Sequence, residues 1–127
     1  MGRRRSFHLS GREHAAPIPI ASVIGNILFS SGIGPNDPDT RDTPEDPAEQ
    51  ARVMFNNIRA VMEAAGGSPD DIIHVHLTLR DRKLREHIDP EWLKMFPDED
   101  ARPARHAVQA DGTGASLMQC QIIAVME

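Results

Sequence analysis

The chain has 127 residues, the size of a single domain, and a chain of this length can bury roughly two-thirds of its unfolded surface. Its 19 acidic and 14 basic residues give a formal charge of -5, which argues against a nucleic-acid partner unless the cations form one patch. The sequence contains no stretch near the roughly 18 apolar residues that span a bilayer. We therefore expect one cytoplasmic domain over residues 1–127, with no membrane contact.

The first residues carry the run Arg3-Arg4-Arg5, which resembles the charged start of an export signal. The polar residues that follow interrupt the chain before an apolar segment of about 7 to 15 residues can form. We expect residues 1–13 to be a loosely ordered, solvated start.

An apolar segment from Ile18 to Ser31 is divided by Gly25-Asn26, a two-residue turn that favours a β-hairpin. The pattern predicts strands near Ile20–Ile24 and Ile27–Ser31. Prolines and acids between Gly32 and Pro47 then predict a long surface loop.

A helix is predicted to begin after Asp46, because Asp46 suits the N-cap, Pro47 the first helical position, and Glu49 the third position of a capping box. Apolar residues then recur at steps of three and four until Gly66-Gly67, where the helix should end. That apolar face must pack on a sheet. Its members are Ala51, Met54, Ile58, Val61, Met62 and Ala65.

Strict alternation from Ile72 to Leu79 predicts a half-buried strand, with Ile73, Val75, Leu77 and Leu79 facing the core. A second helical region follows, which Pro90 should divide into a short turn and a helix beginning near Asp89.

Two final strands are predicted at Arg105–Ala110 and Leu117–Val125, around a turn at Asp111–Gly114. The element order is thus ββαβαββ. It indicates a two-layer α+β domain, with one mixed sheet and two helices on one of its faces.

Four segments together resemble the RidA family, also called YjgF/UK114-like or L-PSP. They are Gly25–Gly32, the helix after Pro47 with its Gly66-Gly67 end, the strand Ile72–Leu79, and Arg102-Pro103-Ala104-Arg105. The resemblance covers about residues 14 to 126. It implies a chorismate-mutase-like fold, a homotrimer with ligand clefts between subunits, and hydrolysis of enamines or imines of amino acids to 2-oxo acids and ammonia. It also implies that neither a metal nor an organic cofactor takes part.

The resemblance implies that Arg105 binds the substrate carboxylate, a role that suits the paired donors of a guanidinium. Without the motif, Arg105 would be interpreted as a surface residue paired with an acid of the segment 98–100. The family's catalytic glutamate on the last strand corresponds to Gln121, which can hold water but cannot relay a proton at ordinary cost. Arg105 and Gln121 are therefore the catalytic candidates.

Five residues are candidates for substrate binding beside Arg105: Ser31, Gly32, Ala107, Trp92 and Asp89. Ser31 and Gly32 match a segment whose backbone faces the ligand, although an ordinary strand end explains them equally well. Trp92 fits the core better than a cleft wall. Asp89 replaces a family asparagine, and we favour a helix N-cap over a charge placed near the ligand. The family's cleft tyrosine is absent, since the chain has no Tyr.

The histidines of the predicted strands and the cysteine are interpreted as structural rather than catalytic or metal-binding residues. His74 and His76 share a strand face but lack a third close ligand, which argues against a metal. His106 should point away from Arg105, and Cys120 fits a buried, unreactive thiol in an apolar run.

The leading functional hypothesis is hydrolytic deamination of a small 2-imino or 2-enamino acid, with a small carboxylate-bearing metabolite as the ligand. An aminomuconate-type substrate is a related possibility. From another class, the protein would bind such carboxylates without catalysis, which Gln121 favours. An endoribonuclease or translation inhibitor ranks last, because the acidic chain offers RNA few contacts.

Overall fold

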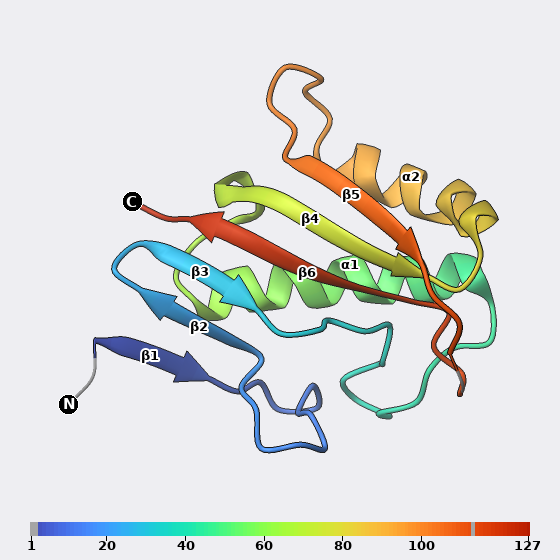
Figure 1. Cartoon of the computed structure of the whole chain (residues 1–127), viewed down its shortest axis with the longest axis horizontal. Coiled ribbons are helices and arrows are strands. Elements are labelled where there is room, and N and C mark those ends of the chain that lie inside the picture. The colour runs from blue at the N-terminus through green and yellow to red at the C-terminus, as the bar shows by residue number, and fades with distance from the viewer. Residues whose placement is uncertain (1–2, 113) are drawn as a thin grey trace.

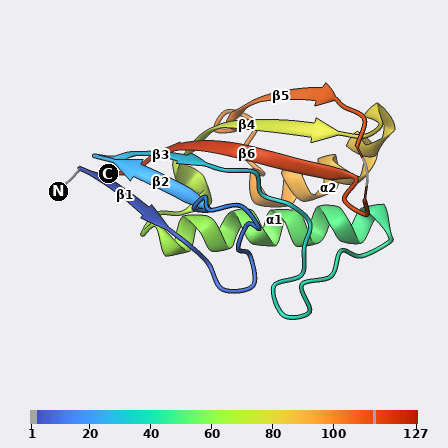
Figure 2. The same cartoon turned by 60° about the horizontal axis from the view of Figure 1, so that its bottom comes forward.

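The computed structural model describes residues 3–112 and 114–127, and these form one mixed sheet under which two helices pack (Figures 1 and 2). The strands lie in the order β1-β2-β3-β6-β4-β5, and all neighbours are antiparallel except β4 and β5. Figure 2 shows both helices on the same face of the sheet, which confirms the predicted two-layer α+β architecture. The elements are β1 (Arg4–Phe7), β2 (Ala21–Ile24), β3 (Ile27–Ser30), α1 (Pro47–Ala64), β4 (Ile72–Leu79), α2 (Arg85–Met95), β5 (Ala104–Gln109) and β6 (Met118–Val125).

The core lies between the helices and the inner face of the sheet, where the apolar side chains of α1, β4 and β6 meet. Among the described residues, no helix has the length and apolar character needed to cross a membrane. The predicted turn between β5 and β6 includes Thr113, which lies outside the described residues.

The predicted hairpin is confirmed in β2 and β3, where Ile24 pairs with Ile27 across the turn. Gly25 has φ +60°, a conformation that a two-residue hairpin turn requires and that glycine adopts without strain.

The expectation of a loosely ordered start is wrong for residues 4–7, which form β1 and pair with β2 along the edge of the sheet. The strand shows no apolar alternation because backbone hydrogen bonds, rather than side-chain burial, hold it in place. Gly11 then packs against the backbone of Pro38 with φ +81°, and a Cβ there would lie only 2.1 Å from the Pro38 carbonyl oxygen. The chain order is therefore βββαβαββ.

Helix α1 begins as predicted, with Asp46 as the N-cap accepting a hydrogen bond from the Glu49 N–H at 3.3 Å. The Glu49 carboxylate does not complete the expected capping box. It forms two hydrogen bonds of 2.8 Å with Arg52 instead. At the other end, Gly66 adopts φ +85° after the last helical residue, the left-handed position at which helices commonly stop.

One residue of β4 departs from the predicted alternation. A register shift between Ile72 and His74 inserts an extra residue opposite β6. Ile72 is therefore buried, whereas Ile73, predicted to face the core, is 57% exposed. Val75, Leu77 and Leu79 face the core as predicted.

Helix α2 continues through Pro90 from Arg85 to Met95, so the prediction of a break and a start near Asp89 is wrong. A proline inside a helix costs about 3 kcal/mol or more because it removes one hydrogen bond and crowds the preceding turn. Here Pro90 lies on the exposed side, while Ile88, Trp92 and Met95 bury the opposite side against the core. Burial of those three side chains offsets the cost.

Gln50 joins the start of α1 to the segment between β5 and β6. Its side chain is almost fully buried, donates to the Pro44 and Ala115 carbonyls at 2.7 and 2.9 Å, and accepts from the Leu117 N–H at 2.9 Å. These bonds fix two connecting segments on one helix.

We predict that Gln50→Leu lowers the free energy of unfolding by about 2–3 kcal/mol, because it removes three part-buried hydrogen bonds between the Gln50 side chain and backbone groups. Urea unfolding followed by circular dichroism measures the change. Glu63→Gln, on the exposed side of the same helix, serves as the control and should change stability by less than about 0.5 kcal/mol. Equal stability of the two variants would contradict the role given to Gln50.

Candidate functional site

A cavity of about 450 Å³ lies where the N-terminal loop, the segment after β3 and the middle of α1 meet the ends of β4 and β5 and the start of β6. This volume suits a small-molecule ligand. Three arginines line it, together with Glu13 and Asp111 as its acids, so its lining carries a slight positive excess that favours anions. The arginines are Arg12, Arg41 and Arg80.

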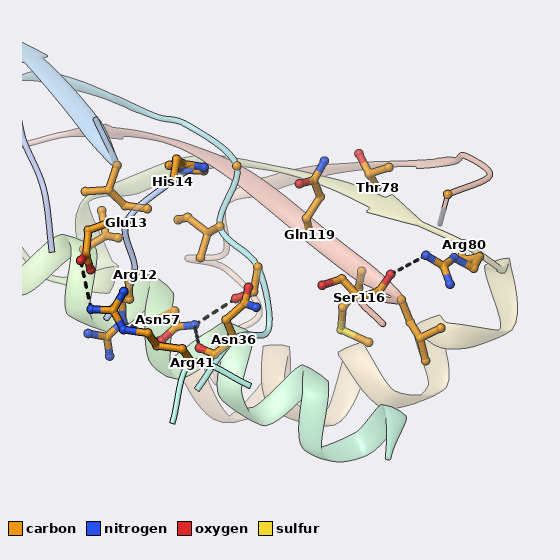
Figure 3. A pocket seen from close by; sticks show the side chains of 18 of the residues that line it. Arg12, Glu13, His14, Asn36, Arg41, Asn57, Thr78, Arg80, Ser116 and Gln119 are labelled. Atoms are coloured by element: carbon orange, nitrogen blue, oxygen red, sulfur yellow. Dashed lines mark hydrogen bonds and ion pairs between the residues drawn. The ribbon is translucent and has the colours of Figure 1, made fainter. Parts of the chain in front are cut away.

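Asn57 holds one end of the cavity together (Figure 3). Its side chain is buried on α1, donates to the carbonyls of Gly34 and Asn36 at 2.9 Å each, and accepts from Arg12 Nε at 2.7 Å. The amide thus fixes the loop after β3 and the N-terminal loop at once. Beside them, Arg41 forms an ion pair with Glu13 at 3.2 Å.

The other end of the cavity is ordered by Arg80, which follows β4. Its guanidinium donates to the carbonyls of Gly114 and Ser116 at 3.0 and 2.8 Å, so the segment leading into β6 is tied to the end of β4. Thr78 and Gln119 complete this end, as Figure 3 shows.

Gly32 and Gln119 lie against each other in the cavity lining. A Cβ built on Gly32 would meet the Gln119 side-chain oxygen at 2.9 Å, so only glycine allows this approach without displacing the glutamine. An isolated bridge between Ile33 and Cys120 sets the two segments side by side. Gly32 therefore lines the cavity, whereas the Ser31 hydroxyl is engaged with the Pro19 carbonyl at 2.7 Å and does not line it.

Gln121, the catalytic candidate of the sequence analysis, lies outside the cavity lining. It pairs with His76 on the outer face of the sheet, two residues along β6 from Gln119. His76 in turn contacts His106 edge-to-face, with 5.7 Å between ring centroids. Among the described residues, no group of three His, Cys, Asp or Glu side chains is placed to hold a metal ion. The glutamine beside Gly32 is thus Gln119.

Arg105 lies elsewhere, at the start of β5 on the face that packs against the helices. It pairs with the inward-facing Val75 of β4, and its guanidinium carbon sits 4.9 Å from the centroid of the Trp92 ring. Arg105 Nη2 also forms an ion pair with Asp89 Oδ1 at 2.9 Å. These three residues and Leu93 line a surface depression of about 290 Å³.

Asp89 does not cap a helix, so the preferred sequence interpretation is wrong. Because α2 continues through Pro90, Asp89 occupies its middle and its carboxylate reaches Arg105. The structure instead places the Asp89 carboxylate beside the Arg105 guanidinium. No acid of the segment 98–100 forms the ion pair with Arg105.

Trp92 belongs to the core, as the sequence analysis favoured, and also supports Arg105. Its ring packs edge-to-face on Phe96 at 4.8 Å, which fixes the surface on which the guanidinium stacks. Arg102 donates to the Phe96 carbonyl at 2.9 Å and so ties the end of α2 to the segment leading into β5. Ala107 is partly buried against the core and lies outside the depression.

The two parts of the site are separate in one chain. Arg105 is the second residue of β5, whereas Ala110 and Gly112, which follow the other end of the strand, line the cavity. Five residues of strand span roughly 16 Å. In addition, Arg105 faces the helices, while Gln121 and its partner His76 face the opposite side of the sheet.

The fold is that of a small two-layer α+β protein, with a guanidinium stacked on a tryptophan beside a surface depression. The family model described as Endoribonuclease L-PSP matches residues 15–126. The chain belongs to this family, the RidA or YjgF proteins.

Relatives named as deaminases are similar over 68–74% of the chain. A 2-iminobutanoate/2-iminopropanoate deaminase of Escherichia coli is 32% identical over 87 residues, 68% of each protein. The 3-aminoacrylate deaminase RutC of Acinetobacter baylyi is 36% identical over 96 residues, 74% of each. These names support a deaminase function.

Solved structures agree with the fold. RidA from an Antarctic Psychrobacter superposes with a TM-score of 0.88 at 25% identity, covering 96% of this chain and 99% of that one. E. coli TdcF with bound serine superposes with a TM-score of 0.86 at 27% identity, covering 97% of this chain and 100% of that one. The family and fold expected from the sequence are thereby confirmed.

We predict that Cys120 resists alkylation in the folded protein. The side chain is 1% exposed, and burial raises the pKa of its thiol, so the reactive thiolate is scarce. Iodoacetamide labelling followed by mass spectrometry is unambiguous because the chain has one cysteine. Labelling should be complete in guanidinium chloride and much slower without it. Equally fast labelling of the folded protein would contradict the burial of Cys120.

Proposed function

We propose that this protein hydrolyses small, reactive 2-imino or 2-enamino acids to 2-oxo acids and ammonia. The observation that carries the proposal is Arg105, whose guanidinium is stacked on Trp92 and opens to a surface depression beside Asp89. A guanidinium presents parallel donors to a carboxylate, and stacking limits the rotamer freedom that binding would otherwise remove. The relatives named as deaminases of imino and amino acids support the same chemistry.

An enamino acid first becomes the imine, as a proton moves from its nitrogen to C3. Water then adds to the C=N carbon of the imine and gives a carbinolamine. One proton of the water passes to the nitrogen as the C–O bond forms. The hydroxyl proton of the carbinolamine then passes to the same nitrogen, the C–N bond breaks as C=O forms, and ammonia departs. A residue that positions the water must accept a hydrogen bond from it. We assign this role to Gln119, which lies against Gly32 in the cavity, in preference to Gln121.

Gln119 is an amide, so it orients water without taking its proton. Proton transfer from water to nitrogen then proceeds through the substrate or a second water. This predicts slower turnover than a carboxylate at the same position would give, since a carboxylate also accepts the proton.

The separation of Arg105 from Gln119 within one chain leads us to propose a site shared between copies. In a homotrimer, Arg105 of one copy would face the Gln119 cavity of its neighbour. The outer sheet face supports such an assembly, because large apolar side chains are exposed there, including Phe29 at 58%. The others on this face are Ile24, Ile27, Ile73, Val108 and Val125.

A second candidate is a binding protein for small carboxylates that does not turn them over. The amide of Gln119 favours it, because the lining of the cavity beside Gly32 offers no carboxylate at that position. In that case Gln119→Glu should create deaminase activity absent from the wild type, whereas Gln121→Glu should not.

We predict that wild-type protein releases ammonia from freshly generated 2-iminopropanoate faster than the spontaneous rate. Arg105→Ala should lower kcat/KM on the order of 10- to 100-fold, since it removes charge-assisted hydrogen bonds to the carboxylate. A coupled ammonia assay with the spontaneous rate subtracted measures both.

Gln119→Ala and Gln121→Ala form a matched pair for the same assay. Gln119→Ala should lower the rate about 10-fold, and Gln121→Ala should stay near wild type. If Gln121→Ala lowers the rate and Gln119→Ala does not, the water-positioning role belongs to Gln121. If wild-type protein accelerates hydrolysis of neither short nor longer imino acids, the result favours the binding protein.

The assembly is tested separately by size-exclusion chromatography with light scattering. We expect a mass of about three times the 14.0 kDa of the chain. A stable monomer would contradict the shared site, because one copy holds Arg105 and Gln119 on different parts of its surface.

A further inference from the structure

Asp89 places a negative charge directly on the arginine that is proposed to bind the ligand. Its Oδ1 lies 2.9 Å from Arg105 Nη2, and both side chains line the same depression. The Asp89 side chain is 52% exposed and that of Arg105 is 22% exposed, so both remain open to a ligand. The depression is therefore bipolar.

The guanidinium can serve two anions at once. It carries five N–H donors in a planar fork, and Asp89 engages its Nη2 end while Trp92 covers one of its faces. A ligand carboxylate can bind along the remaining donors. It would then lie next to the Asp89 carboxylate, and two like charges at this range repel each other.

The repulsion depends on what else the ligand carries. A 2-oxo acid carries only the negative charge of its carboxylate, which Asp89 repels. A 2-iminio acid, protonated on nitrogen, carries a cationic N–H group on the carbon next to its carboxylate. That group can donate to Asp89 while the carboxylate binds Arg105, so both charges of the depression are matched.

We propose that Asp89 makes the Arg105 depression selective for zwitterionic 2-iminio or 2-amino acids over monoanionic 2-oxo acids. This inference rests on the proposed function and names the charge type of its substrate. Hydrolysis replaces the cationic nitrogen by a neutral carbonyl oxygen, so the product loses its contact with Asp89 but keeps the repulsion. Asp89 thus selects the substrate and favours departure of the product.

The test compares two stable ligands of equal size and opposite charge pattern, 2-aminobutanoate and 2-oxobutanoate. Their dissociation constants are measured by titration calorimetry, or by the fluorescence of Trp92, the only tryptophan. The variants are Asp89→Asn, which keeps the shape, and Glu63→Gln, which makes the same change in net charge on the exposed side of α1.

Wild type should bind the amino acid more tightly than the oxo acid. Exposed charge pairs typically change affinity by up to about 5-fold. Asp89→Asn should therefore lower the preference for the amino acid by about 5-fold or more. The substitution weakens binding of the amino acid, which loses its partner for the cationic group, and strengthens binding of the oxo acid, which is no longer repelled. Glu63→Gln should leave the preference unchanged.

Two failures are distinguishable with Arg105→Ala. If this variant abolishes binding of both ligands but Asp89→Asn leaves their ratio within 2-fold of wild type, the selectivity role of Asp89 is overturned and the carboxylate role of Arg105 stands. If wild type binds neither ligand, or if Arg105→Ala binds both as wild type does, the inference falls together with the proposed function.

Discussion

Two buried amides on α1 determine where the loops of this protein lie. Gln50 and Asn57 are seven residues apart on one helix face, and each is almost fully removed from solvent. A buried amide without partners is costly, and here the side chains of both residues bond to residues in connecting segments. The helix therefore dictates the course of the loop after β3, the N-terminal loop and the segment before β6, which together enclose the cavity.

The sheet separates the two chemical elements of the proposed site. Arg105 faces the helix layer, where Trp92 and Phe96 hold its guanidinium flat. Gln119 lines a cavity near the opposite end of β5. Because a strand is rigid and neither residue can cross the sheet, no loop motion within one chain joins them. A function that needs both residues therefore depends on how copies of the chain meet, which is the ground for proposing an assembly of copies.

Local sequence signals correctly predicted the features that depend only on neighbouring residues, namely the ends of helix α1 and the hairpin turn. Asp46-Pro47 and Gly66 set the ends of α1, and Gly25 sets the hairpin. Tertiary structure decided the rest. Residues 4–7 pair through their backbone and show no pattern, a register shift turns Ile73 outward, and core burial carries α2 through Pro90. Arg105 could be identified from its motif. Which of the two glutamines on the same face of β6 adjoins Gly32 depends on the Ile33–Cys120 bridge, which no local pattern encodes.

Strand β1 gives the arginine-rich start a role that its sequence does not reveal. It forms one outer edge of the sheet, and an outer edge presents unpaired N–H and C=O groups to which a strand of another molecule can add. Arg4 and Arg5 are exposed along this edge. Two identical edges that approach each other would bring like charges together, so the arginines oppose uncontrolled strand addition and the aggregation that follows from it.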